Sequence, residues 1–113
     1  MNERKELGKI EKCTFGFGGY QDRSIGLHIT LSMGNSKSST SKAAWDANRV
    51  KPNENSSWTE ADRNQYYAEI VRYISDLLAA AKVESVDQLE GVPIEITFNG
   101  LMLKKWRILT EVL

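Results

Sequence analysis

Apolar and polar residues follow two different periods along this chain, and each period predicts a different kind of element. Between residues 58 and 82 the apolar residues recur at steps of three and four, which is typical of one face of an α-helix. The positions in this stripe are Tyr67, Ile70, Val71, Ile74, Leu77, Leu78 and Ala81. Thr59 can act as the N-cap, and Glu60 and Asp62 place negative charge near the positive end of the helix dipole. We therefore expect one long helix over residues 59–82.

Four other segments alternate with a period of two, as strands with one buried face do. In residues 7–17 the predicted inward face carries Cys13, Phe15 and Phe17, and residues 25–33 alternate from Ile25 to Met33. The glycine-rich stretch GFGGYQDRS between them predicts a turn, so these two strands should form a hairpin.

A second hairpin is predicted near the C-terminus. Residues 92–98 alternate up to Asn99-Gly100, a pair that favours a two-residue type I′ turn, and the return strand covers residues 101–113. On this strand Trp106, Ile108 and Val112 should share one face, whereas Met102 and Lys104 fall out of step and indicate a bulge or a partly exposed edge.

The expected architecture is a single α+β domain over residues 1–113. Its order is ββαββ, with a four-stranded, largely antiparallel sheet packed by the long helix. Residues 34–57 are rich in serine, lysine and asparagine and predict a long loop within the domain, of a length that is usually functional or disordered. Ser85 is a plausible cap for a short helical turn over residues 86–89, and residues 1–6 should lie at the frayed surface.

Composition and charge exclude several classes of protein. The 113 residues are 41% hydrophobic and 27% charged, and fifteen basic side chains balance fifteen acidic ones, so no global field favours nucleic acid or an anionic membrane. The single cysteine, Cys13, can form neither an internal disulfide nor a cysteine zinc cluster. No apolar run approaches the roughly 20 residues of a membrane span, and the charged N-terminus lacks the apolar centre of a signal peptide. We expect a cytoplasmic protein without a membrane partner.

Catalytic and cofactor chemistry finds little support in the sequence. The glycines of FGFGG lead into a strand rather than a helix, so they do not form a nucleotide loop. His28 is the only histidine, lies on the polar face of its strand, and has no orienting partner fixed by spacing. The charged pairs Asp62–Arg63 and Glu69–Arg72 suit a solvated helix face. We expect no enzyme, no cofactor and no metal site.

The long loop carries the best candidates for binding. Between residues 34 and 51, four basic residues oppose the single acid Asp46, a local charge of +3 around Trp45. Protein interfaces concentrate tryptophan, tyrosine and arginine, and cations beside an exposed aromatic ring also suit single-stranded nucleic acid. The partner-binding candidates are Trp45, Arg49, Tyr20, Lys37, Lys42 and Lys51, and a nucleic-acid surface would add Lys104, Lys105 and Arg107.

Three fragments, FGFGGYQDRSIGLHITL, WTEADR and VDQLEGVPIEITFNGLMLKKWRILTEVL, resemble a group of short uncharacterised proteins of tailed phages and prophages. The shared features are a GGYQD turn, a W-T-E-x-D-R helix start and a K-x-W-R-I-L-T-E-V ending. Residues 34–57 depart from that group, whose members carry a shorter glycine- and tryptophan-rich segment, and the family supplies no catalytic residues.

The resemblance implies a phage accessory protein in a bacterial cytoplasm. The leading hypothesis is a non-enzymatic protein that binds a host or phage protein, with a bacterial anti-phage defence system such as CRISPR as a candidate target. The alternative is an accessory protein that binds single-stranded or non-specific nucleic acid in phage DNA transactions. The sequence leaves open whether the chain forms a homodimer.

Overall fold

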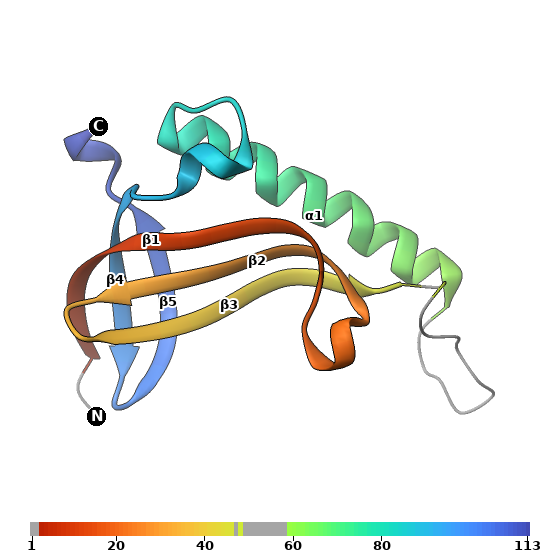
Figure 1. The fold of residues 1–113 in the computed structure, drawn as a ribbon, viewed down its shortest axis with the longest axis horizontal. Coiled ribbons are helices and arrows are strands. Elements are labelled where there is room, and N and C mark those ends of the chain that lie inside the picture. The colour runs from red at the N-terminus through yellow and green to blue at the C-terminus, as the bar shows by residue number, and fades with distance from the viewer. Residues whose placement is uncertain (1–2, 47, 49–58) are drawn as a thin grey trace.

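The computed structural model describes residues 3–46, 48 and 59–113, which form one sheet and one long helix (Figure 1). The sheet is antiparallel, with five strands in the order β3-β2-β1-β4-β5. The elements are β1 (Glu3–Gly18), β2 (Ser24–Met33), β3 (Ser36–Trp45), α1 (Glu60–Ala81), β4 (Pro93–Asn99) and β5 (Met102–Ile108). The α+β class with one long helix is confirmed. The four-stranded ββαββ order was wrong by one strand, since the chain runs βββαββ.

The additional strand, β3, lies in the first half of the segment predicted as a loop. It pairs with β2 along its whole length, from Met33 opposite Ser36 to Ser24 opposite Trp45. Gly34, with a φ of 59°, makes the tight turn between them. Because β3 carries mainly serine, threonine and lysine, no apolar alternation identifies it as a strand. It is a strand because its backbone pairs with the edge of β2. The rest of the predicted loop, residues 47 and 49–58, lies outside the described residues.

Strand β1 is long and belongs to both halves of the sheet. Its first part, Glu3–Lys9, pairs with β4, whereas Lys9–Gly18 pairs with β2 on the opposite edge, with a register shift between Ile10 and Lys12. The β4–β5 hairpin therefore crosses the β1–β2–β3 half at a steep angle (Figure 1). Residues 3–6, expected to fray, are part of this strand.

A single hydrophobic core lies where the two halves of the sheet meet. Its fully buried side chains are Ile10, Leu27, Leu31, Leu89, Ile94 and Ile96. The helix contributes Tyr73, Ile74, Leu77 and Leu78, all from its C-terminal half. The N-terminal half of α1 therefore extends beyond the core, towards β3. Cys13 is buried as expected, but Phe15 and Phe17, predicted on the same inward face, are 56% and 43% exposed.

The local signals at the ends of elements are mostly confirmed. Thr59 and Asp62 exchange side-chain-to-backbone bonds in a capping box, with Asp62 N–H donating to Thr59 Oγ1 over 3.2 Å and Thr59 N–H donating to Asp62 Oδ2 over 2.8 Å. The predicted hairpin forms, and β5 carries a register shift near Leu103. The type I′ turn over Asn99-Gly100 was wrong, because Asn99 pairs with Met102 and the two turn residues are Gly100 and Leu101, of which only Gly100 has a positive φ, 64°. The predicted last strand was too long. The observed strand, β5, ends at Ile108, and a short 3₁₀ turn over Thr110–Val112 follows, in which Val112 is exposed. Within the described ranges, no helix has the length and hydrophobicity to cross a membrane.

Candidate functional site

Large apolar side chains are exposed together at one end of the sheet. This end, which we name the aromatic end, is where Gly18, Ser24 and Trp45 stand opposite one another in register. Its exposed side chains are Phe15 (56%) and Phe17 (43%) on one face of the sheet, Val71 (64%) on the adjacent helix, and Trp45 (41%), which the register places on the other face with Ser24 and Gly18. Scattered exposed apolar residues are normal in soluble proteins, whereas a group of them indicates a binding surface.

A groove of about 240 Å³ lies between β1 and α1 at this end. Its described lining residues are Phe15, Ile25, Asp46, Tyr67, Ile70 and Val71, and we name it the Phe15 groove. The two exposed residues at its rim come from different elements, Phe15 from β1 and Val71 from α1, so the groove exists only in the folded chain. An apolar hollow with a few polar groups at fixed positions is the usual form of a binding site.

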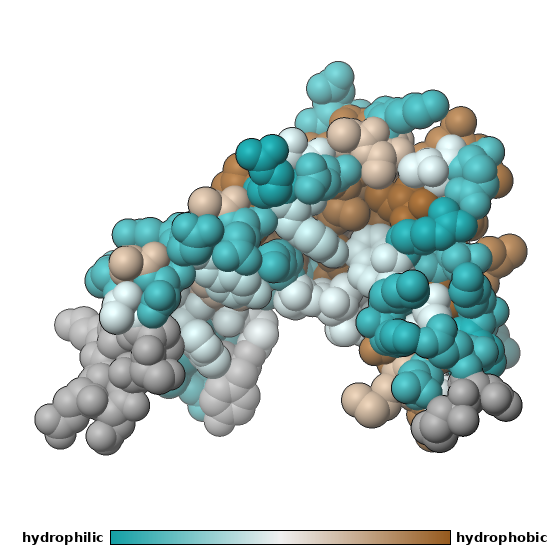
Figure 2. All heavy atoms as spheres, turned by 180° about the vertical axis from the view of Figure 1, so that it is seen from behind, coloured by the Kyte–Doolittle hydropathy of each residue, from teal (hydrophilic) through white to brown (hydrophobic). Residues whose placement is uncertain are grey.

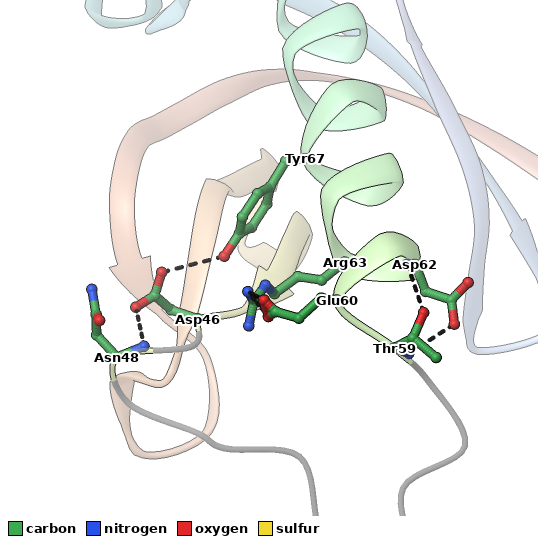
Figure 3. Close-up of polar contacts among 7 residues, drawn as sticks. All are labelled: Asp46, Asn48, Thr59, Glu60, Asp62, Arg63 and Tyr67. Carbon is green, nitrogen blue, oxygen red and sulfur yellow. Dashed lines mark hydrogen bonds and ion pairs between the residues drawn. The ribbon is translucent and has the colours of Figure 1, made fainter.

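The one charged residue among those lining residues is Asp46, and it is held in place. The Tyr67 hydroxyl donates a hydrogen bond to Asp46 Oδ1 over 3.3 Å, and the backbone N–H of Asn48 donates to Oδ2 over 2.9 Å (Figure 3). Its own N–H donates to the Arg23 carbonyl over 3.0 Å. Burial, followed by the charge of Asp46, raises the pKa of Tyr67, so the phenol keeps the proton that it donates.

A second hollow, of about 280 Å³, lies between the end of β3 and the first turns of α1. Ala43, Ala44, Trp45, Asp62, Arg63 and Tyr66 line it. The expectation of a solvated Arg63 was wrong, because only 8% of this residue is exposed. Arg63 pairs with Glu60 rather than with Asp62, and its guanidinium lies 5.7 Å from the centre of the Tyr67 ring (Figure 3). A long side chain near a helix start can pack its stem against aromatic rings, which helical spacing alone does not reveal.

His28 has a structural position on the face of the sheet opposite Phe15. Its Nε2 lies 3.1 Å from the Gly16 carbonyl, which can only accept, so Nε2 carries the proton. Its Nδ1 then accepts from the Ser41 hydroxyl over 3.0 Å. Neither of these partners is the carboxylate that would orient a catalytic base. The ring also lies against Gly18, where an added Cβ would come within 2.8 Å of it. His28 thus fastens the end of β1 to β2 and β3.

The structure brings only some of the predicted binding residues together. Trp45 lies at the aromatic end, but Lys37 lies eight residues earlier on β3, about 26 Å away at the usual rise of a strand. Lys37 pairs with Glu11 over 2.7 Å. Lys42 pairs with Glu69 over 3.8 Å and lies 4.9 Å from the Tyr66 ring centre. Arg49, Lys51 and the side chain of Tyr20 are outside the described part of the chain.

The basic residues of the last strand lie away from the aromatic end. Lys104 pairs with Glu3, and Arg107 pairs with Glu95 over 3.1 Å and with Glu111 over 2.8 Å. Strand β5 is at the opposite side of the molecule from the end of β3 (Figure 1), and Figure 2 shows a hollow that separates the two arms of the arched molecule. The predicted cations and Trp45 therefore do not form one continuous surface.

Sequence reasoning missed the exposure of Phe15 and Val71, and it did not connect Asp46 with them. Phe15 and Val71 fit perfectly regular apolar patterns, and such a pattern cannot tell where the covering element ends. A helix that extends beyond the core is a property of the assembled fold. Within the described residues, no group of three or more histidines, cysteines or carboxylates could hold a metal ion.

Comparisons of the chain with protein-family models, with curated proteins and with solved structures find no match. The arrangement of the aromatic end is therefore interpreted from its own geometry.

Proposed function

We propose that this chain is a non-enzymatic protein that acts by binding a protein partner through the aromatic end. The observation that carries the proposal is the exposure of Phe15, Phe17, Trp45 and Val71 at one end of the fold, beside a groove with a single fixed carboxylate. Aromatic and large apolar side chains supply most of the energy of protein interfaces, and they cluster where the partner excludes water.

The proposed setting is a bacterial cell infected by a tailed phage or carrying a prophage. It rests on the resemblance of the GGYQD turn, the WTEADR helix start and the C-terminal fragment to phage proteins. The partner in that setting is a host or phage protein, and a bacterial anti-phage defence system such as CRISPR is the host target that we propose to examine first.

The alternative is an accessory role in binding single-stranded or non-specific nucleic acid. Its basic residues carry less available charge than the sequence suggests, because Lys37, Lys42, Lys104 and Arg107 each pair with a carboxylate. The formal net charge is zero, whereas dedicated nucleic-acid binders are usually basic as domains. Exposed pairs of this kind are weak, so phosphates could still exchange with them, and the test must separate the two roles.

The test is capture of partners from a bacterial lysate on the immobilised chain, with and without nuclease. The proposal expects a protein in near-stoichiometric amount that survives nuclease and is lost when Phe15 is replaced by serine. Phe15→Ser removes exposed surface from a residue that is already 56% in solvent, so circular dichroism should show an intact fold. Capture that disappears with nuclease, or that is equal for wild type and F15S, contradicts the proposal.

A further inference from the structure

Strand β3 forms one outer border of the sheet and pairs with β2 alone (Figure 1). Asp46 N–H donates to the Arg23 carbonyl over 3.0 Å, which continues the β2–β3 register and shows that the even-numbered residues of β3 bond to β2. Because backbone groups alternate between the two edges of a strand, Lys37, Ser39 and Ser41 direct their N–H and C=O groups outward. No backbone bond from another described residue reaches these outward groups.

The free part of this border is Ser36–Lys42, which we name the β3 edge. Beyond it, Ala43, Ala44 and Trp45 line the second hollow together with the first turns of α1, so the helix borders the strand there. Along the β3 edge the register with β2 is unbroken, and neither a bulge nor a proline interrupts the strand. A regular, uncovered edge of this kind is a template for pairing with another strand.

The other outer border of the sheet, β5, is better protected against such pairing. It is seven residues long, a register shift interrupts its pairing with β4, and it carries two consecutive lysines. Short length, irregularity and lysine are common means by which proteins prevent pairing at an edge. The β3 edge also has two lysines, but each is paired with a carboxylate of its own chain, Lys37 with Glu11 and Lys42 with Glu69.

The side chains of the β3 edge are complementary to a second copy of the same strand. In an antiparallel self-pair, outward-facing residues lie opposite outward-facing residues, so odd numbers meet odd numbers. Lys37 is odd and Lys42 is even, so Lys37 never lies directly opposite Lys42 of the other copy. The register centred on Ser39 uses the whole β3 edge, and its facing pairs are Ser39 with Ser39, Ser38 with Thr40, Lys37 with Ser41 and Ser36 with Lys42. Facing hydroxyl side chains can hydrogen-bond, whereas facing like charges would be destabilising.

We propose that two copies of this chain associate through their β3 edges and join their two five-stranded sheets into one continuous antiparallel sheet. The backbone groups of Lys37, Ser39 and Ser41 bond those of Ser41, Ser39 and Lys37 in the other copy. Phe15 and Val71 lie on β1 and α1, so the Phe15 groove of each copy stays free. The dimer therefore goes beyond the proposed function and presents two binding surfaces to a protein partner.

Sedimentation equilibrium of the full chain between about 5 µM and 2 mM measures this association. The paired segments are shorter than a standard interface requires, so we expect a weak dimer with a Kd of about 10 µM to 1 mM. Amide hydrogen exchange gives the location. Exchange at Lys37, Ser39 and Ser41 should slow as the protein concentration rises, and exchange in β5 should not change.

Two kinds of substitution at Ser39 test the pairing. Ser39→Pro removes the outward N–H at the centre of the pair, and an edge strand tolerates proline where the N–H faces solvent, so the β2–β3 ladder should remain. We expect S39P to weaken association about tenfold or more. Ser39→Lys and Ser39→Glu each place like charges opposite one another and should weaken it about fivefold, whereas an equal mixture of S39K and S39E should associate at least as tightly as wild type.

Thr14→Lys is the matched control, because it adds the same charge to the same face of the sheet on the interior strand β1. T14K should associate as wild type does, and circular dichroism checks the fold of every variant. If S39P does not fold, the comparison of mixed and separate S39K and S39E decides the question.

A chain that stays monomeric at about 2 mM would overturn the proposal. The same conclusion follows if folded S39P dimerises like wild type, or if S39K and S39E associate no better mixed than alone. A dimer that Phe15→Ser dissociates and S39P leaves intact would also overturn it, because self-association would then belong to the aromatic end. Capture of a protein partner by wild type and F15S is measured separately, so the proposed function stands or fails independently of the dimer.

Discussion

Alanine at Gly26 should be severely destabilising, while alanine at Gly16, directly opposite it in the β1–β2 pair, should be harmless. A Cβ at Gly26 would lie 2.3 Å from the Lys42 carbonyl oxygen and 2.5 Å from Ala43 Cα, and real Cβ atoms essentially never come within 3.0 Å of such neighbours. Both obstacles are backbone atoms of β3, so β3 would have to withdraw by at least 3.0 − 2.3 = 0.7 Å. No side-chain rotation relieves this contact.

The cost combines overpacking, about 1–3 kcal/mol, with the loss of one or two ladder hydrogen bonds at about 1 kcal/mol each. We therefore expect Gly26→Ala to lower the free energy of unfolding by about 3 kcal/mol, which corresponds to a Tm lower by roughly 10–20 °C. A Cβ at Gly16 would meet nothing within 4 Å. Gly16→Ala should then be neutral or more stable by about 0.4–1 kcal/mol, because alanine restricts the unfolded chain.

Urea denaturation and thermal melts followed by circular dichroism measure both variants. A G26A protein that melts within about 2 °C of wild type would show that β3 does not approach β2 as described. That result would also remove the register that places Trp45, Ser24 and Gly18 together at the aromatic end. Equal destabilisation by G16A and G26A would refute the argument as well, since the two differ in the space around the added methyl group and only Gly26 has a positive φ, 158°.

Three further predictions concern the core, the C-terminal turn and the helix start. Burial, and then the charge of Glu90, raise the pKa of Cys13 to about 11, so at pH 8 its thiolate fraction should be about 100-fold below that of an ordinary cysteine of pKa 9.0. Iodoacetamide should therefore alkylate the native protein slowly, and an alkylation rate equal to that of the unfolded chain would contradict this. The stability that the protonated thiol contributes below pH 9 should be lost as the pH rises through 11. Hydrogen bonds from Arg107, and then a backbone hydrogen bond, lower the pKa of Glu111 from 4.5 to about 2, so the attachment of the C-terminal turn is complete above pH 4.5 and lost as the pH falls through 2. An NMR titration of Glu111 should show a higher midpoint in Arg107→Gln than in wild type, and identical midpoints would refute the pairing. Thr59→Ala should lower the free energy of unfolding by about 1 kcal/mol in urea melts by removing the cap of α1, and no loss would show that the capping box does not form in solution.

The parts of the fold that local chemistry specifies were predictable from the sequence. The helix begins after the predicted N-cap Thr59 and ends at Ala81, within a residue of the expected boundary. The short turn after Ser85 forms where its residues indicate, and so does the β4–β5 hairpin, although its turn residues are Gly100 and Leu101 rather than Asn99 and Gly100. In each case a few neighbouring residues satisfy the backbone themselves, so the information is local.

The parts that depend on assembly were not predictable in the same way. Strand β3 has almost no apolar residues, and it is a strand because β2 offers it an edge. Phe15 and Val71 follow the periods of buried residues, yet both are exposed, because the helix joins the core cluster only from Tyr73 onward. The prediction for Arg63 was wrong in the opposite direction. It was expected to be solvated, but it is buried, with its guanidinium paired with Glu60 and lying over the Tyr67 ring.

The candidate site, too, was predictable only where local sequence specifies it. Trp45 was identified from its type and its basic surroundings, and it does lie exposed at the aromatic end. The lysines expected around it are distributed along β3, because extended backbone separates residues that a compact loop would bring together. The Phe15 groove joins β1, β2 and α1 with Asp46, and no spacing in the sequence links these segments.

The most direct test of the central claim is a side-by-side capture experiment with wild type, Val71→Asp and Val112→Asp under nuclease. The two valines have the same exposure, 64%, so the variants differ in where the charge is placed rather than in how much surface it alters. We predict that V112D retains the captured protein at the wild-type level and that V71D loses at least roughly nine-tenths of it, a tenfold change equal to about 1.4 kcal/mol. Equal capture by both variants, or equal loss in both, would contradict a binding surface at the aromatic end.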